Sequence, residues 1–130
     1  MKKYPYVPKS NKKLEVGEIW PIKLPEKHYA YGVVLYVPNY AVSRKSFVAG
    51  LVNLIKKPNT SVEGLTNKPV EIYEYAEANI KTIVSFGEQI IGKIHVESYI
   101  LDKIKKEDIR VTWGYNVINL KAEKLFKERQ

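Results

Sequence analysis

The side chains best suited to metal binding are few and widely separated in this chain. His28 and His95 are the only two histidines, and there is no cysteine. Zinc sites draw three or four ligands from histidine, cysteine and carboxylate side chains at short, regular spacings. The two histidines show no such spacing, and we interpret them as ordinary surface or strand-edge residues. We therefore predict no metal ligands and no cofactor.

The patterns that accompany nucleophilic or phosphate chemistry are also missing. No Gly-x-Ser-x-Gly motif occurs, and the 7 glycines stand singly, whereas a phosphate-binding loop needs several together. Glu71, Glu74 and Glu77 form a local acidic stretch, which a solvated face explains more simply than a catalytic pair. We predict no catalytic residue, no small-molecule substrate and no enzymatic activity. A hydrolase with a carboxylate pair in a deep cleft is the enzymatic alternative.

Aromatic residues favour a binding function. The chain contains 10 tyrosines and 2 tryptophans, and these side chains supply rigid, amphipathic contact area at protein interfaces. The alternative is that they simply pack well on half-buried strands. The predicted partner-binding residues are Trp20, Tyr29, Tyr31, Tyr40, Glu71, Tyr73, Tyr75 and Glu77.

Positive charge is concentrated at the N-terminus. The formal net charge is +8, and residues 1–13 contain five lysines and no acid. Such a segment can steer nucleic acid or acidic partners, or it can merely keep the protein soluble. If it binds nucleic acid, deleting residues 1–13 is expected to abolish much of that binding and to leave binding of a protein partner largely intact.

The stretch from Val16 to Ile55 predicts three antiparallel strands, at 19–24, 29–37 and 47–55. Pro21 lacks a donor and places the first strand at a sheet edge or a bulge. The second strand is apolar on both faces, which predicts a central position. Within it, Gly32 would allow a bulky neighbour to approach closely.

The rest of the chain is less regular. Residues 70–84 fit both a strand and a helix, and we favour a strand to about Ala76 followed by a turn. A strand is predicted at 88–96, a short helix or loop at 97–108, a last strand at 110–120 and a closing helix at 120–130.

Together these elements predict one α+β domain over residues 14–130, preceded by a basic arm. The expected sheet is mainly antiparallel, curved and five- to six-stranded, with a tendency toward an SH3-like small barrel and with one or two short helices, including a C-terminal one. Residues 1–13 are expected to be flexible, although Tyr4, Tyr6 and Val7 offer a means of docking. No run is long enough to span a membrane, and the lack of cysteine fits a bacterial cytoplasmic protein.

Two stretches resemble the immunity protein 26 family of bacterial polymorphic toxin systems. The first is Val16-Gly-Glu-Ile-Trp-Pro-Ile-Lys-Leu-Pro followed by Lys27-His-Tyr-Ala-Tyr-Gly-Val-Val-Leu, with Glu18 where the family usually has aspartate. The second pairs Pro69-Val-Glu-Ile-Tyr-Glu-Tyr-Ala with Ser85-Phe-Gly-Glu-Gln-Ile-Ile-Gly-Lys-Ile. The resemblance covers roughly residues 14 to 96. It implies a cytoplasmic protein, encoded beside a toxin, that binds and neutralises that toxin without catalysis.

The charge of the chain bears on the partner. A cognate toxin held by electrostatic complementarity to a basic protein would be acidic at the contact, unless Glu71, Glu74 and Glu77 form the contact face. The alternative to an immunity function is a small-barrel nucleic-acid-binding protein that uses the basic arm and the strand aromatics.

Overall fold

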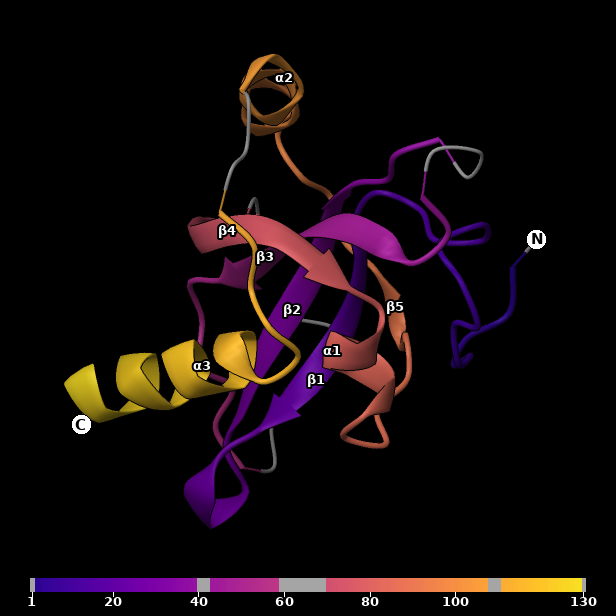
Figure 1. Ribbon diagram of the computed structural model, residues 1–130. Helices are drawn as coiled ribbons and strands as arrows, with labels where there is room; N and C mark the ends of the chain where they lie inside the picture. Colours follow the sequence, from indigo (N-terminus) through magenta and orange to yellow (C-terminus); the bar gives the residue numbers. More distant parts are fainter. Residues whose placement is uncertain (1, 40–42, 59–69, 108–110, 130) are drawn as a thin grey trace.

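The computed structural model describes residues 2–39, 43–58, 70–107 and 111–129. These residues form a strongly twisted antiparallel sheet of five strands with helices on both faces (Figure 1). The predicted α+β class, the antiparallel sheet and the C-terminal helix are confirmed. Within the described part of the chain the sheet stays open and does not close into a barrel.

The strands are adjacent in the order β4-β3-β2-β1-β5. Their bounds are β1 (Glu18–Lys23), β2 (Tyr29–Tyr36), β3 (Ser46–Val52), β4 (Ile72–Asn79) and β5 (Gly92–Lys93). The helical elements are the 3₁₀ turn η1 (Pro25–Lys27), α1 (Lys81–Val84), α2 (Ser98–Lys106) and α3 (Val117–Glu128). The edge strand β4 therefore lies far from β1 in the sheet.

The central strand β2 separates two hydrophobic cores, as its apolar character on both faces predicts. Val34 belongs to the core beneath α1 and α3, whereas Tyr31 and Val33 belong to the core beneath α2. Each helix contributes apolar side chains at a spacing of three or four residues. From α3 these are Ile118, Ala122, Leu125 and Phe126; from α2 they are Ile100, Leu101 and Ile104.

Gly32 allows the close approach that the sequence predicts. A Cβ atom at this position would lie 2.1 Å from Cζ2 of Trp20 on the neighbouring strand β1. The indole therefore lies directly over the glycine, and its other neighbour is Phe47, whose ring centroid is 5.8 Å away in an edge-to-face arrangement. This Trp20–Gly32–Phe47 packing occupies the centre of the α3-side core.

Pro21 lies in the part of β1 that pairs with β2 on one side and with no described strand on the other side. The proline is paired with Tyr31 of β2, whereas β5 pairs only with Glu18 and Ile19 at the start of β1. The missing backbone donor of proline therefore costs no hydrogen bond of the ladder to β5. The edge strand of the sheet is β5 and not β1, so the predicted edge position holds only locally, at Pro21, where no strand of the described chain pairs on the outer side of β1.

One predicted strand is wrong. Residues 110–120 were expected to form the last strand, but α3 begins at Val117, and the preceding described residues form only one bridge, between Thr112 and Glu77. Gly114 and Asn116 are poor strand formers, and Asn116 is the N-cap residue of α3. Ile118 packs at helical spacing with Ala122, Leu125 and Phe126 in the core beneath α3, so tertiary packing overrides the strand propensity of valine and isoleucine.

Other boundaries shift by a few residues. The ambiguous stretch 70–84 contains both elements: β4 continues to Asn79 and the single turn of α1 follows. The strand expected at 88–96 shrinks to Gly92–Lys93, with Ile90 paired instead to Tyr6. Residues 97–108 contain the helix α2. None of the described helices has the length and apolar character that crossing a membrane requires.

Candidate protein-interaction surface

The N-terminal arm, described from residue 2 to residue 13, lies against the domain through a buried carboxylate. Glu18, the first residue of β1, is 0% exposed. Its Oε1 atom accepts hydrogen bonds from the Tyr6 hydroxyl at 2.6 Å and from the Glu15 backbone N–H at 2.7 Å. Its Oε2 atom accepts from the Tyr4 hydroxyl and from Nζ of Lys2, each at 3.0 Å. We call these five residues the Glu18 cluster.

The backbone at Gly17 positions Glu18. Gly17 has a φ of +95°, and a Cβ atom there would lie 2.5 Å from the Ile94 carbonyl oxygen, so only glycine fits. Its N–H donates to Val34 and its carbonyl accepts from the Ile94 N–H, each at 2.8 Å. The Glu18 side chain is thereby directed under the arm at the point where β1 begins.

The Glu18 cluster combines two carboxylates, two phenols and an ammonium group, which are groups that catalyse proton transfer in other proteins. Here the Glu18 carboxylate accepts four hydrogen bonds, which satisfies its lone pairs. Glu18 also lines none of the hollows described below. The arrangement therefore fits a structural attachment of the arm, which sequence reasoning left open.

The cluster perturbs the ionisation of its members. Burial, together with the hydrogen bond to Glu18, raises the pKa of Tyr4 to about 12, and the same causes raise the pKa of Tyr6. Burial by itself lowers the pKa of Lys2, but hydrogen bonds with Glu15 and Glu18 outweigh it, and the net pKa is raised. The Lys2 hydrogen bond lowers the pKa of the Glu15 carboxyl. Each shift favours the protonation states that hold the arm in place.

This predicts a loss of stability at alkaline pH. Between pH 10 and 12 an unfolded chain releases the Tyr4 proton while the folded protein retains it, so the free energy of unfolding should fall across that range. Tyr4→Phe should reduce the slope, as measured by urea unfolding at a series of pH values. Equal slopes for the wild type and Tyr4→Phe would contradict the assignment.

Of the predicted partner-binding residues, two are buried. Trp20 and Tyr31 are each 1% exposed and lie in the α3-side and α2-side cores, respectively. A buried side chain cannot touch a partner while the fold is intact, so the placement of these two on a contact surface is corrected: they are core residues. Core packing of strand aromatics was the alternative that the sequence left open for both residues.

Two other predicted residues lie elsewhere. Tyr29 is partly buried near the start of β2, where Nζ of Lys56 lies 5.6 Å from its ring centroid and its backbone pairs with the same lysine. It belongs to β2, which β3 separates from the edge strand β4. Tyr40 lies outside the described residues.

The other four predicted residues come together at the edge strand β4. Glu71 immediately precedes it, and Tyr73, Tyr75 and Glu77 belong to it. The two tyrosines connect β4 to helices on opposite faces of the sheet: the Tyr75 hydroxyl donates to Glu107 after α2 at 2.5 Å, and the Tyr73 hydroxyl donates to Glu128 of α3 at 3.5 Å. Burial and the bond to Glu107 raise the pKa of Tyr75 to about 12.

Helix α2 lies across the sheet and leaves a hollow on each side. The β4–α2 hollow has a volume of about 330 Å³ and is lined by Glu71, Ile72, Tyr75, Tyr99, Ile100 and Lys103. Tyr99 is 70% exposed, the largest exposed fraction among the exposed large hydrophobic residues of the described chain. An exposed tyrosine beside an apolar hollow is a typical contact residue of protein interfaces.

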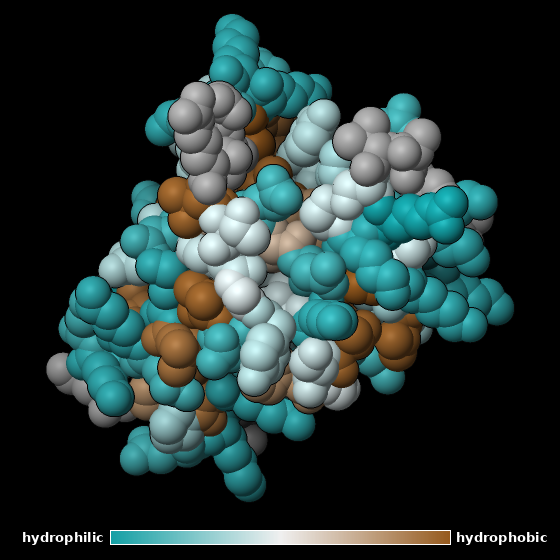
Figure 2. Space-filling view, in the orientation of Figure 1, coloured by the Kyte–Doolittle hydropathy of each residue, from teal (hydrophilic) through white to brown (hydrophobic). Residues whose placement is uncertain are grey.

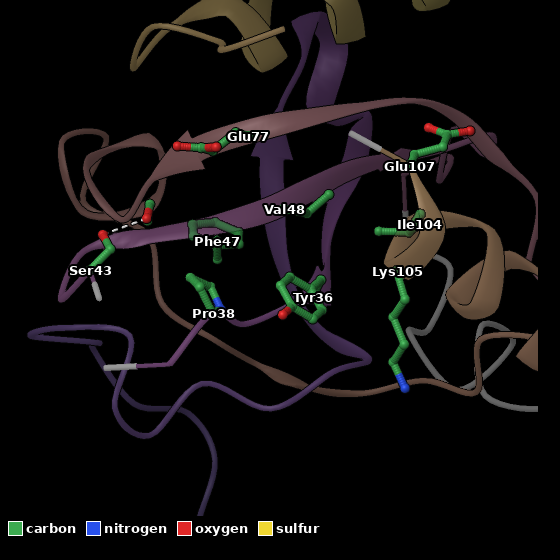
Figure 3. A pocket seen from close by; sticks show the side chains of 10 residues that line it. Tyr36, Pro38, Ser43, Phe47, Val48, Glu77, Ile104, Lys105 and Glu107 are labelled. Carbon is green, nitrogen blue, oxygen red and sulfur yellow. Dashed lines mark hydrogen bonds between the residues drawn. The ribbon is translucent and has the colours of Figure 1, made fainter. Parts of the chain in front are cut away.

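The second hollow, the β3–α2 hollow, has a volume of about 380 Å³. Figure 3 shows Tyr36 and Pro38 on one side of it and Ile104 of α2 across from them, while the Lys105 side chain extends away. Ser43, Ser46 and Glu77 also line it. Glu77 therefore contributes to this hollow and Tyr75 to the other, so β4 takes part in both.

We define the β4–α2 surface as the β4 edge of the sheet with the adjoining part of α2. Glu71, Tyr75, Glu77, Tyr99 and Ile100 lie on the α2 side of this edge, whereas Tyr73, which bonds to Glu128, lies on its α3 side. Sequence reasoning missed the contribution of α2, because Tyr99 and Ile100 stand in a stretch that fitted a loop as well as a helix. It also missed Asn11, which is discussed below, because a polar residue among lysines gives no burial signal. The acidic group named as a solvated face is part of the surface: Glu71 and Glu77 flank the tyrosines.

Charges on and around this surface are partly paired. Lys121 of α3 lies 2.7 Å from the Glu74 carboxylate, and Nζ of Lys103 lies 3.8 Å from Glu107. Both are exposed pairs of small energetic weight. Among the described residues no group of three or more histidine, cysteine or carboxylate side chains is placed to hold a metal ion. The arrangement offers aromatic and carboxylate groups to a partner.

A second group of exposed aromatic residues lies after α1 and before α3. Phe86, 41% exposed, stacks on Tyr115, 56% exposed, with ring centroids 6.1 Å apart. On the face shown in Figure 2 the apolar residues form separate groups among hydrophilic side chains, with no continuous apolar field. Because Phe86 and Tyr115 are exposed aromatic residues outside the β4–α2 surface, substitutions at this pair serve as controls for substitutions at that surface.

Comparison with known proteins adds no relative: no family model, no curated protein and no solved structure matches the chain.

Proposed function

We propose that the protein is an immunity-type protein that binds and neutralises a cognate bacterial toxin without catalysis. The motifs of β1, β2 and β4 resemble the immunity protein 26 family. The observation that carries the proposal is the gathering of Glu71, Tyr73, Tyr75 and Glu77 at one sheet edge, beside the exposed Tyr99 of α2.

The proposed contact face carries acidic residues, although the protein as a whole is basic. Glu71 and Glu77 flank Tyr73 and Tyr75, so the partner should supply basic groups around an apolar centre. This is the exception that the net charge of +8 left open. A toxin with a basic contact region, such as an enzyme that acts on nucleic acid, fits this face better than an acidic one.

The test is co-expression with the product of the adjacent gene, followed by calorimetry on the purified pair. Rescue of growth and a stoichiometric complex are the expected results. Turnover of a substrate by the protein alone, or failure to bind that product, would contradict the proposal.

Tyr99→Ala is the most informative single substitution at this surface. The side chain is 70% exposed, so its removal should leave the fold intact. Central tyrosines at interfaces contribute about 2 kcal/mol or more, so the toxin affinity should fall by about thirtyfold. Tyr115→Ala is the matched control, because it removes an exposed tyrosine from a different site and should change the affinity by less than about threefold. Equal effects of the two substitutions would contradict the assigned face.

The nucleic-acid alternative predicts a different dependence. Lys3, Lys9 and Lys13 of the arm are exposed and can contact phosphates, and binding through them would weaken steeply with salt. Base stacking, however, cannot use the buried Trp20 or Tyr31.

The deletion of residues 1–13 no longer separates the two functions. It would remove three partners of the buried Glu18 and so destabilise the whole domain. Changing Lys3, Lys9 and Lys13 to glutamine together removes arm charge while keeping the Glu18 cluster. Nucleic-acid binding should then be lost, whereas toxin binding through the β4–α2 surface should be retained.

A further inference from the structure

A second contact of the N-terminal arm lies at Asn11, at the opposite end of the arm from the Glu18 cluster. Asn11 is 0% exposed. Its side-chain Nδ2 donates to the carbonyl oxygens of Ser43 at 2.7 Å and Ser46 at 2.8 Å. Its backbone N–H donates to the Arg44 carbonyl oxygen at 2.7 Å. One residue of the arm thus binds three carbonyl groups within residues 43–46.

These carbonyl groups belong to a short segment that shapes the β3–α2 hollow. Ser43 and Ser46 line that hollow, and their hydroxyl oxygens are 2.5 Å apart, as the dashed line in Figure 3 shows. Residue 46 is also the first residue of β3, opposite Asn79 at the end of β4. The position of residues 43–46 therefore affects the wall of the hollow and the register at which β3 begins.

Backbone hydrogen bonds at Ser43 and Lys45 also hold this segment. The Ser43 N–H donates to Asn39 at 3.1 Å, and the Lys45 carbonyl accepts from the Ile80 N–H at 2.9 Å. Asn11 supplies three donors to the segment, and a conformation that broke these bonds would leave the buried Asn11 donors unpaired at a cost in free energy. The N-terminal arm is thus attached at two parts of the sheet, at Glu18 in β1 and at residues 43–46 before and at the start of β3.

We propose that Asn11 is a positioning residue, through which the N-terminal arm fixes the conformation of residues 43–46 and so the shape of the β3–α2 hollow. The arm is in this way part of the framework of the interaction surface. The consequence for toxin binding rests on the proposed function, but the effect on the hollow does not.

Hydrogen exchange of single amides in the isolated full-length protein tests this inference. In Asn11→Ala, the amides of Ser43 and Ile80 report on residues 43–46, because they bond to Asn39 and Lys45. Their exchange should rise by about ten- to a hundredfold, since two hydrogen bonds that hold the segment are lost. The amides of Lys56 and Ile94, which bond to Tyr29 and Gly17 at other parts of the sheet, should show little change.

Two further variants keep the test decisive. Lys9→Ala, at an exposed position of the same arm, is the matched control and should leave the exchange of Ser43 and Ile80 unchanged. Asn11→Ser is milder, keeps a hydroxyl, and provides the measurement if Asn11→Ala does not fold. An equal rise at all four amides, or no rise at Ser43 and Ile80, would overturn the inference.

Toxin binding separates the inference from the proposed function. A local rise in exchange together with unchanged toxin affinity would confirm Asn11 as a positioning residue and would exclude the β3–α2 hollow from the contact. A toxin that fails to bind even the wild-type protein would overturn the proposed function and leave the exchange result standing.

Discussion

Glu18→Ala is expected to lower the free energy of unfolding by about 3 to 5 kcal/mol, the range found when one partner of a buried charged network is removed. The substitution leaves the Tyr4 and Tyr6 hydroxyls, the Lys2 ammonium and the Glu15 N–H without their common acceptor. It also creates a cavity at a side chain that is 0% exposed. Urea or guanidinium unfolding followed by tryptophan fluorescence measures the change.

Glu15→Ala is the matched control. Glu15 lies three residues earlier and forms ion pairs with Lys2 at 2.8 Å and Lys93 at 3.3 Å, but its side chain is 47% exposed. Exposed ion pairs contribute about 1 kcal/mol or less, and the alanine retains the backbone N–H that donates to Glu18. A loss of stability in Glu18→Ala no larger than in Glu15→Ala would show that the arm is not attached through the buried carboxylate.

Gly32→Ala is expected to destabilise the fold by about 1 to 3 kcal/mol or more through overpacking. The added methyl group would lie 2.1 to 2.6 Å from three atoms of the Trp20 ring, distances that a rigid, buried indole cannot relieve by rotating. Trp20 would have to move against Phe47, which packs on it edge to face. A change in the near-ultraviolet circular dichroism of the indole should accompany the loss of stability.

Gly92→Ala tests the same substitution where space is available. A Cβ atom at Gly92 would have no heavy atom within 4 Å, and no positive φ restricts this position. The stability should therefore change by less than about 0.5 kcal/mol. Similar effects at Gly32 and Gly92 would mean that Trp20 does not occupy the position over β2 described above.

The sequence was informative wherever local pattern and burial agree. Strands β1 to β3 carry runs of branched and aromatic residues with clear turns between them, so their order and the central place of β2 followed from alternation. Pro21 and Gly32 added stereochemical constraints that need no knowledge of neighbours. These features depend on the residue itself and on its position in a strand.

Prediction failed where long-range contacts decide. Residues 110–120 have the alternation of a strand, but the helical stripe that begins at Ile118 packs onto the sheet beside Leu125 and Phe126. The strand β5 has only two residues, and Ile90 before it is bridged to Tyr6 of the arm. Neither partner is visible from the local sequence.

The candidate surface was predicted in part for the same reasons. Four of its residues were named because tyrosines and glutamates on one strand suggested a contact face. Trp20 and Tyr31 were named on chemistry alone, and the packing of both sheet faces buries them. Tyr99 could be assigned to the surface only after α2 was placed beside β4. Likewise, the role of Glu18 could not be predicted, because its partners belong to an arm that its lysines had indicated to be solvent-exposed.

Chemical-shift mapping with the neighbouring gene's product tests the central claim most directly. Isotope-labelled protein titrated with that toxin should show its largest amide perturbations at Tyr73, Tyr75, Tyr99 and Ile100, with little change at Phe86 and Tyr115. Perturbations confined to the arm lysines or to the Phe86–Tyr115 pair would contradict the account and place the contact on another face.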